Sequence, residues 1–171
     1  MTIAQHPIRI LVLNPDSKAA EEMAEKFWGH CRDKVTVHVA TNQREAVEVM
    51  AMYNDLDTLL VHHDRRNGRA ALEVVLSDLV TPFPMFRGRI IMFFENSGTG
   101  TEDQVAEAAN HGSWCFFDIP MDEQAMCSLV QTVTKMGHRP DQQQKPAAPA
   151  AVDNRLARFV GEKGARLAPN T

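Results

Sequence analysis

Two adjacent histidines followed by an aspartate, His62-His63-Asp64, are the residues of this sequence best suited to metal or acid–base chemistry. They come at the end of an apolar segment typical of a β-strand, and open parallel sheets bind ligands beyond the carboxyl ends of their strands. Successive side chains of a strand point to opposite faces, so His62 and His63 would not hold one ion together if the strand runs through them. We therefore expect His62 to be a hydrogen-bonded residue that fills a pocket, and we expect no metal site.

Other polar groups are weaker candidates. The segment Ser97-Gly98-Thr99-Gly100-Thr101 precedes an expected helix and its amides could bind an anion, but it lacks the lysine of a phosphate-binding loop. Asp16 is a single carboxylate, which favours a helix cap over a cation ligand. Cys31, Cys115 and Cys127 are too few and too widely spaced for a disulfide framework or a zinc motif. No cofactor is expected.

The elements that would position these residues alternate between strand and helix. Short β-branched and apolar runs are typical of strands buried on both faces of a parallel sheet, and the segments between them place apolar residues at helical spacing. The expected strands are 8–13, 34–40, 57–62, 89–94 and 114–117, and the expected helices are 18–31, 42–53, 69–80, 101–111 and 121–136. This alternation predicts an α/β fold, a five-stranded parallel sheet with helices on both faces.

The chain is long enough for one domain and an extension. Its 171 residues are 44% hydrophobic and 23% charged, as is common in globular proteins. Residues 1–137 form the predicted domain, and 138–152 form a flexible linker rich in Pro, Gln and Ala. Residues 153–171 form a tail that could contain a short amphipathic helix, with Leu156 and Phe159 on one side.

Charge and hydropathy argue against several functions. The net charge is -4, although residues 138–171 carry six basic and three acidic residues. An acidic domain repels nucleic acid, so we expect no nucleic-acid partner beyond weak contact by the tail. No apolar run approaches the roughly 20 residues of a membrane-spanning helix, and the first residues lack the layout of a secretory signal. We expect a protein of the reducing cytoplasm that does not bind membranes.

Three local matches resemble the receiver domain of bacterial response regulators, over about residues 7–137. Ile10-Leu11-Val12-Leu13-Asn14-Pro15 sits where that family has an apolar strand ending in an acidic pair. Asp57-Thr58-Leu59-Leu60-Val61-His62 is similar to the third strand, which begins with Asp and ends with the phospho-accepting Asp. Phe116-Phe117-Asp118-Ile119-Pro120-Met121 is similar to the fifth strand with its Lys-Pro turn. The resemblance implies a flavodoxin-like (βα)5 fold of strand order 2-1-3-4-5, and a cis peptide bond before Pro120.

The departures from the receiver pattern bear on function. By the same resemblance, the acidic pair, the acceptor, the hydroxyl residue and the lysine are replaced by Asn14 and Pro15, His62, Phe94 and Ile119. Phosphoryl transfer in receivers needs a magnesium ion held by several oxygen ligands. A pocket lined by Phe94 and Ile119 would disfavour an unpaired dianion. We therefore expect no enzyme, but a regulatory protein that binds a protein partner without being phosphorylated.

The expected partner surfaces are apolar. In receivers the face formed by the fourth helix, fifth strand and fifth helix often mediates docking or dimers, which suggests a homodimer through Trp114, Phe116 and Met126. The segment 82–86 either tucks under the sheet edge or forms an exposed patch. Its candidate contact residues are Phe83, Met85 and Phe86. Leu156 and Phe159 would belong to a tethered docking helix that orders on binding.

A different function is also open. A flavodoxin-like domain could bind a small ligand or a nucleotide at the carboxyl edge of the sheet, in a pocket around Asn14, His62 and Ser97.

Overall fold

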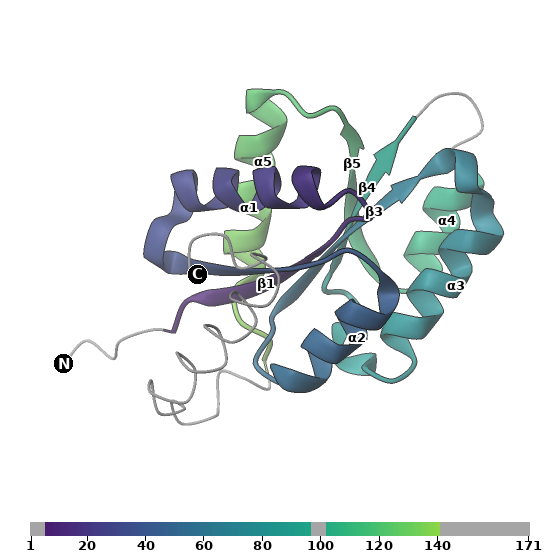
Figure 1. Ribbon diagram of the computed structural model, residues 1–171, viewed down its shortest axis with the longest axis horizontal. Helices are drawn as coiled ribbons and strands as arrows, with labels where there is room; N and C mark the ends of the chain where they lie inside the picture. The colour runs from purple at the N-terminus through teal and green to yellow at the C-terminus, as the bar shows by residue number, and fades with distance from the viewer. Residues whose placement is uncertain (1–5, 97–101, 141–171) are drawn as a thin grey trace.

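A parallel sheet is the central layer of the molecule (Figure 1). The computed structural model describes residues 6–96 and 102–140. The strands lie in the order β2-β1-β3-β4-β5, which confirms the expected fold class and strand order. Their bounds are β1 (Ile8–Leu13), β2 (Val35–Ala40), β3 (Thr58–Asp64), β4 (Ile90–Glu95) and β5 (Ser113–Ile119). β2 and β5 are therefore the edges of the sheet.

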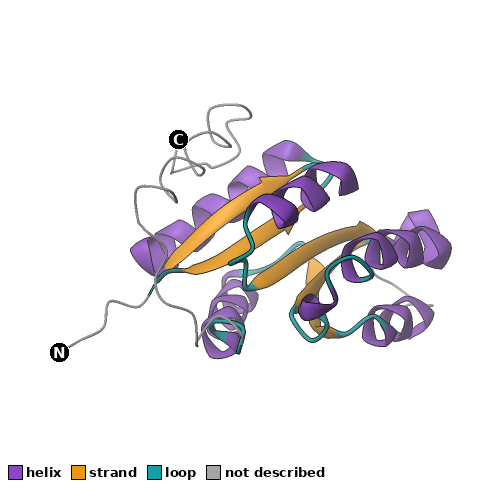
Figure 2. Cartoon of the chain, turned by 90° about the horizontal axis from the view of Figure 1, so that it is seen from below, coloured by secondary structure: helices purple, strands orange, loops and turns teal. Residues whose placement is uncertain are grey.

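Helices cover both faces of the sheet, as Figure 2 shows from below. α1 and α5 share one hydrophobic core with the sheet, and α2, α3 and α4 share another. Their bounds are α1 (Ser17–Cys31), α2 (Gln43–Met52), α3 (Gly68–Val80), α4 (Glu102–Asn110) and α5 (Glu123–Met136). In the described part of the chain, no helix is long and apolar enough to cross a membrane.

The central strands feed both cores because their side chains alternate between the faces. On β1, Ile10 and Val12 belong to the core under α1 and α5, whereas Leu11 and Leu13 belong to the core under α2, α3 and α4. Burial on both faces explains why these strands are continuously apolar. β5 differs, since burial alternates along it and every second side chain is exposed. One face of this edge strand is therefore only partly covered.

Side chains cap the amino ends of α1, α2 and α5. The Asp16 carboxylate accepts hydrogen bonds from the backbone N–H groups of Lys18 and Ala19 at 3.0 and 3.2 Å. Asn42 and Asp122 cap α2 and α5 in the same manner. Each cap satisfies N–H groups that have no partner inside the helix. Asp16 is thus a helix cap, as its isolation in the sequence predicts.

The carboxylate of Asp57 joins three segments at the amino end of the sheet. It is fully buried just before β3. Its Oδ2 accepts a hydrogen bond from the Arg9 backbone N–H at 3.1 Å and lies 3.0 Å from Nδ1 of His138, and its Oδ1 accepts from the Arg139 backbone N–H at 2.9 Å. The Arg89 guanidinium donates to the Asp57 carbonyl and to two carbonyls at the end of α5. These bonds tie β1, β3 and the chain after α5 together.

The folded domain therefore extends past the boundary at residue 137 predicted from the sequence. That boundary places His138 and Arg139 in the linker, but Arg139 is only 3% exposed. Its guanidinium lies 5.0 Å from the centre of the Phe86 ring and donates to the Asn54 carbonyl. The amino-acid composition of this segment does not reveal that Arg139 packs against the domain, because its contacts (Asn54, Asp57 and Phe86) are distant in the sequence. The linker from residue 141 and the tail with its expected helix lie outside the described residues.

His38 is a buried imidazole on β2. It is fully buried, and its ring centre lies 4.2 Å from that of Tyr53. Neither ring nitrogen has a hydrogen-bond partner among the described residues. Burial lowers the pKa of His38 from 6.5 to about 3, and the charge of Arg9 contributes in the same direction. The folded protein therefore keeps this imidazole neutral at pH 7.

The low pKa of His38 should make folding sensitive to acid. The unfolded chain binds a proton at His38 below pH 6.5 and the folded chain does not. The contribution of His38 to the free energy of unfolding is therefore largest above pH 6.5 and falls towards pH 3, by about 1.4 kcal/mol per pH unit. When the pH is lowered from 7 to 5, the free energy of unfolding should fall by about 2 kcal/mol less in His38→Leu than in the unmodified protein, as measured by urea denaturation. The exposed His6→Gln variant should behave as unmodified protein, and equal losses for all three proteins would contradict this assignment.

Replacing Asp57 should be among the most damaging changes to the fold. Asp57→Ala leaves two buried backbone N–H groups without an acceptor, and we expect it to lower the free energy of unfolding by about 3 kcal/mol. Urea denaturation measures the loss. Asp33→Ala, which removes an exposed carboxylate, is the control and should change stability by less than about 0.5 kcal/mol. A similarly small effect for both variants would show that Asp57 does not anchor the sheet.

Candidate functional site

The carboxyl ends of the strands form the mouth of the sheet, where folds of this topology place ligands. Asn14 follows β1, His62 lies near the end of β3, Glu95 ends β4 and Ile119 ends β5. Strand pairing sets Glu95 opposite Ile119, and His62 opposite Phe93. The mouth is therefore formed by an amide, an imidazole, a carboxylate and an aliphatic side chain.

Asn14 and Asp16 shape the turn that leaves β1. The Asn14 side chain is 6% exposed, and its Oδ1 accepts a hydrogen bond from the Asp16 N–H at 2.9 Å. The Asn14 N–H donates to the Ala40 carbonyl at 3.0 Å. Pro15 lies exposed between the two. Asn14 and Asp16 thus both bond to the local backbone, and the acidic pair expected in a receiver is absent from this turn.

His62 is a partly buried imidazole beside one carboxylate. Its Nε2 lies 3.4 Å from Oε2 of Glu95, and the two side chains are 12% and 45% exposed. Burial lowers the pKa of His62, while the charges of Glu95, Asp64 and Asp16 act in the opposite direction. Burial is the larger effect, so most His62 side chains are neutral at pH 7.

Asp64 is bound by two neighbouring side chains. The Arg66 guanidinium donates to both carboxylate oxygens at 2.6–3.1 Å, and Nδ2 of Asn96 donates to Oδ1 at 3.0 Å. The hydrogen bond from Arg66 is the main reason why the pKa of Asp64 lies well below its usual range. Among residues 6–96 and 102–140, no three carboxylates or imidazoles at the mouth bring their ligand atoms within 4.8 Å of one another.

Phe94 does not line the mouth together with His62, contrary to the expectation from the resemblance. It pairs with His63, is 1% exposed and belongs to the core under α2, α3 and α4. Its ring centre lies 6.3 Å from that of His63 and 5.9 Å from that of Phe116. Paired residues of neighbouring strands share a face, and His62 is one position away from the pair. Strand alternation therefore places Phe94 and His62 on opposite faces.

The same alternation separates His62 from His63, as the sequence predicts. His63 is 5% exposed and faces the core that contains Phe94. Burial lowers its pKa, and hydrogen bonds to the Gly68 backbone and the Gln104 side chain oppose that shift. The two histidines therefore have different environments, and they do not chelate one ion.

A buried polar cluster between α3 and α4 escapes sequence analysis. Gln104 and Glu107 are 6% and 5% exposed. Gln104 donates to the Arg65 carbonyl at 3.2 Å, and Glu107 accepts from Nε of Arg69 at 3.0 Å. Gln104 and Glu107 are three residues apart, a spacing that places both on the same side of a helix. This spacing, together with the neighbouring apolar Ala108, is the only signal in the sequence that both face the core.

The peptide bond between Ile119 and Pro120 is cis, the isomer implied by the resemblance to receivers. Ile119 packs partly against the core under α1 and α5. The last residue of β5 is therefore apolar, at the position where receivers have a lysine.

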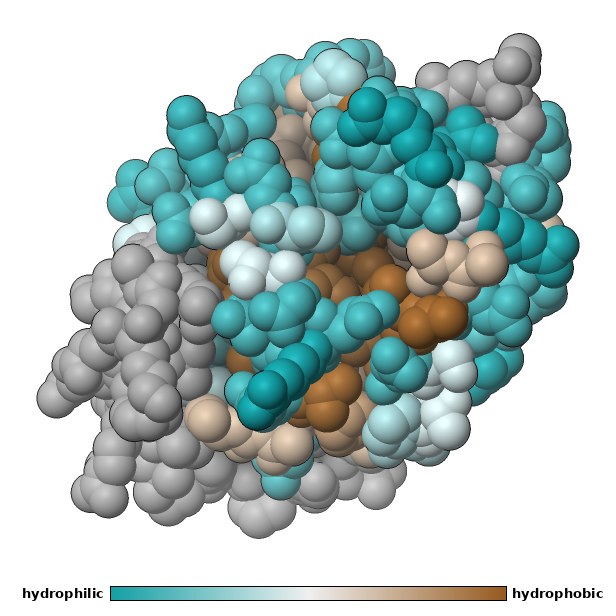
Figure 3. Space-filling view, turned by 45° about the vertical axis from the view of Figure 1, so that its right-hand side comes forward, coloured by the Kyte–Doolittle hydropathy of each residue, from teal (hydrophilic) through white to brown (hydrophobic). Residues whose placement is uncertain are grey.

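The candidate interface residues divide into an exposed and a buried group. Trp114 and Phe116 on β5 are 61% and 47% exposed, and Met85 is 46% exposed. Figure 3 shows hydrophobic side chains gathered in a hollow on one side of the molecule, bordered by hydrophilic ones. Trp114 and Phe116 are thus the candidate interface residues of β5 that the structure leaves exposed.

Phe86 and Met126 are not surface residues, which corrects two of the predicted contacts. Each is 3% exposed. Phe86 packs into the core beside α3 and under the Arg139 guanidinium, and Met126 is the inward residue of the first turns of α5. Phe83 is partly buried against the same core as Phe86. In the 82–86 segment, Phe83 and Phe86 thus pack towards the core, whereas Pro82, Pro84 and Met85 are exposed. Leu156 and Phe159 lie outside the described residues.

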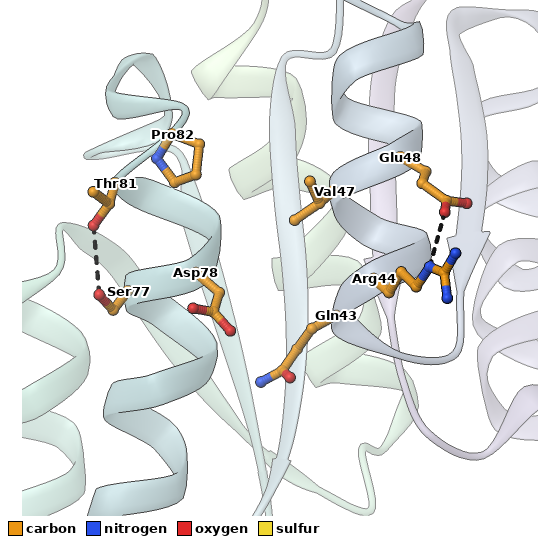
Figure 4. Close-up of a pocket in the computed structure, with 8 residues that line it drawn as sticks. All are labelled: Gln43, Arg44, Val47, Glu48, Ser77, Asp78, Thr81 and Pro82. Atoms are coloured by element: carbon orange, nitrogen blue, oxygen red, sulfur yellow. Dashed lines mark hydrogen bonds and ion pairs between the residues drawn. The ribbon is translucent and has the colours of Figure 1, made fainter.

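An open groove of about 610 Å³ lies between α2 and α3. Figure 4 labels the residues that line it, most of which are of polar or charged type although the exposed lining surface is largely apolar: Gln43, Arg44, Val47, Glu48, Ser77, Asp78, Thr81 and Pro82. Arg44 pairs with Glu48 on α2, and Ser77 contacts Thr81 on α3. The groove does not include Asn14 or His62, around which the sequence suggested a ligand pocket. Ser97 and the rest of the Gly-rich segment lie outside the described residues.

The pairing of His62 with Glu95 can be tested by titration. Glu95 is the main group that favours the protonated imidazole, so Glu95→Gln should lower the pKa of His62 further below its usual value. A pH series of NMR spectra of the His62 ring protons measures this. Glu48→Gln, which removes a carboxylate on α2, should leave the His62 titration unchanged. A His62 pKa that stayed the same or rose in Glu95→Gln would show that the carboxylate does not act on the ring.

Solved structures with the same fold come from bacterial signalling and assembly proteins. A protein related to pilus assembly from Burkholderia pseudomallei has a TM-score of 0.58 at 15% identity, over 80% of this chain and 96% of that one. The receiver domain of a response regulator from Bermanella marisrubri has a TM-score of 0.54 at 19% identity, over 74% and 97%. A CheY-like protein from Pseudomonas aeruginosa has a TM-score of 0.52 at 13% identity, over 83% and 98%. No family model and no curated protein matches the sequence. The chain therefore has the CheY-like receiver fold.

Proposed function

We propose that this chain is a regulatory module with a receiver fold that acts by binding another protein and not by phosphoryl transfer. The observation that carries the proposal is His62 at the end of β3, beside a β1 turn formed by Asn14 and Pro15. A receiver holds magnesium with carboxylates at these places, and the ion neutralises charge on the transferred group.

The remaining polar groups at the mouth support this proposal because local structure already uses them. Asp16 caps α1, and Asp64 is bound by Arg66 and Asn96. Glu95 lies against His62. Recruiting these carboxylates to a cation would require breaking the cap and the Asp64 hydrogen bonds. On this basis the module has no catalytic step, and its output is the complex that it forms.

The surface proposed for binding is the exposed face of β5. Trp114 and Phe116 are 61% and 47% exposed and lie two positions apart on the same face of β5, and contiguous exposed apolar surface is typical of interaction sites. β5 is an edge strand, so its outer backbone groups have no strand partner in the sheet. We propose a second copy of this chain as the partner, because a self-complementary contact pairs the same patch on both copies.

The structural neighbours are consistent with a role of this kind. The Burkholderia protein is described as related to pilus assembly, and the Bermanella protein as a response regulator. We propose a regulatory role for this chain as well.

Self-association should depend on β5 and not on phosphorylation. Trp114→Glu combined with Phe116→Glu places charge in the contact, so we expect the dimer to weaken at least about tenfold, measured by sedimentation equilibrium. Val74→Glu is the matched control, because Val74 is a 55% exposed apolar residue on α3. This control should dimerise as the unmodified protein does.

The phosphorylation arm of the experiment uses acetyl phosphate with magnesium. We expect intact-mass spectra without a phosphoryl adduct, and a sedimentation profile that the phosphodonor leaves unchanged. Magnesium-dependent phosphorylation that alters association would overturn the proposed mechanism. A monomer at all concentrations, or equal dimerisation of the double variant and the unmodified protein, would overturn the proposed surface.

A further inference from the structure

Three side chains that are far apart in the sequence meet where the end of α1 passes the start of α5. His30 lies in the last turn of α1, and Glu123 and Cys127 lie one turn apart on α5. All three are exposed, and their ligand atoms lie within 4.8 Å of one another. In the described part of the chain this is the one group of three or more His, Cys, Asp or Glu side chains that could reach a single ion. We propose that it binds a divalent transition-metal ion of the zinc type.

The donor set selects the class of metal. An imidazole nitrogen, a thiolate sulfur and a carboxylate oxygen are ligands of Zn²⁺ and of similar borderline ions. Mg²⁺ and Ca²⁺ prefer shells made of oxygen atoms and would gain little from His30 or Cys127. The site is therefore chemically different from the magnesium site of a receiver. It also lies on helices and not at the mouth of the sheet.

The distances fit a tetrahedral ion. Nε2 of His30 lies 3.5 Å from Oε1 of Glu123. Zinc bonds of about 2.0–2.2 Å to nitrogen and oxygen place two such ligand atoms about 3.4 Å apart in a tetrahedron. Glu123 and Cys127 are four residues apart on one helix, a spacing that puts both side chains on the same side. Because the Cys127 side chain is exposed, it can change rotamer to complete the set.

The charges around the site favour a dication. A neutral imidazole, one carboxylate and one thiolate supply two negative charges. The carboxyl end of α1, where His30 lies, adds the negative end of a helix dipole. The amino end of α5 acts in the opposite direction, but the two anionic ligands there are full charges at bonding distance whereas the dipole is partial. Attraction should therefore exceed repulsion.

Three protein ligands leave the fourth position of a tetrahedral ion open to water or to a ligand from another protein. A bound ion would link α1 to α5, which otherwise contact each other mainly through the buried core beneath them. This proposal does not depend on the proposed function, because none of the three residues lies on the exposed face of β5.

Metal binding can be measured on the full 171-residue chain with its thiols kept reduced. The residues after 140 contain no His and no Cys, so they cannot supply either ligand type. Zn²⁺ affinity is measured by competition with a chromophoric chelator, and Co²⁺ serves as a spectroscopic probe. We expect one ion per chain and a sulfur-to-cobalt charge-transfer band. The affinity should rise with pH, because binding releases the thiol proton.

Variants at exposed positions test the ligands without threatening the fold. Cys127→Ser should abolish the charge-transfer band and weaken Zn²⁺ binding by at least about tenfold, and His30→Gln and Glu123→Gln should weaken it as well. Cys115→Ser, at a partly buried thiol, and His6→Gln, at an exposed imidazole, are the controls and should bind as the unmodified protein does. Circular dichroism checks that each variant is folded. Absence of the band in the unmodified protein, equal binding by Cys127→Ser, or loss of binding in Cys115→Ser would each overturn the proposal.

Discussion

A buried carboxylate at Asp57 constrains how the whole sheet is assembled. A charge removed from water is tolerated only when hydrogen bonds replace the lost hydration. Here the donors are backbone N–H groups 48 and 82 residues away in the chain, together with the His138 ring. The carboxylate is therefore satisfied only when β1 lies beside β3 and the chain leaving α5 has returned to the same place. The hydrogen bonds of Asp57 therefore couple the pairing of β1 with β3 to the position at which the chain leaves α5.

The two ends of the sheet use polar side chains in different ways. At the amino end, Asp57 gathers donors from distant segments. At the carboxyl end, the polar groups bond to close neighbours: Asn14 to its own turn, Asp16 to the start of α1, and Asp64 to Arg66. Local bonds of this kind define a loop but leave no set of carboxylates pointing at one place. The receiver fold is thus combined with a mouth at which, among residues 6–96 and 102–140, no three carboxylates or imidazoles bring their ligand atoms together.

Much of the fold could be predicted from the sequence, because each element carries its own local pattern. The run of apolar residues at 8–13 is a strand with the expected bounds, and the other elements differ by only a few residues at their ends. Errors arose where distant contacts decide. The sequence around Arg139 is typical of a linker, and only the fold brings Asp57 and Phe86 next to this residue. Phe94 could be assigned to the wrong pocket because alignment to a family gives a position along a strand but not the face. His30, Glu123 and Cys127 form no motif, since 92 other residues separate the first two.

The residues proposed to act in binding are those that the cores do not need. On α5, Met126, Leu129 and Val133 are buried, so packing determines their size and polarity. Glu123 and Cys127 occupy the other side of the same helix, where packing imposes no such demand. On β5, Phe117 packs inward whereas Trp114 and Phe116 remain exposed, although a polar side chain would be better solvated at both places. Phe116 keeps an edge contact with the Phe94 ring, so the apolar surface that the proposed contact with a second copy would cover is mainly the outer part of both aromatic groups.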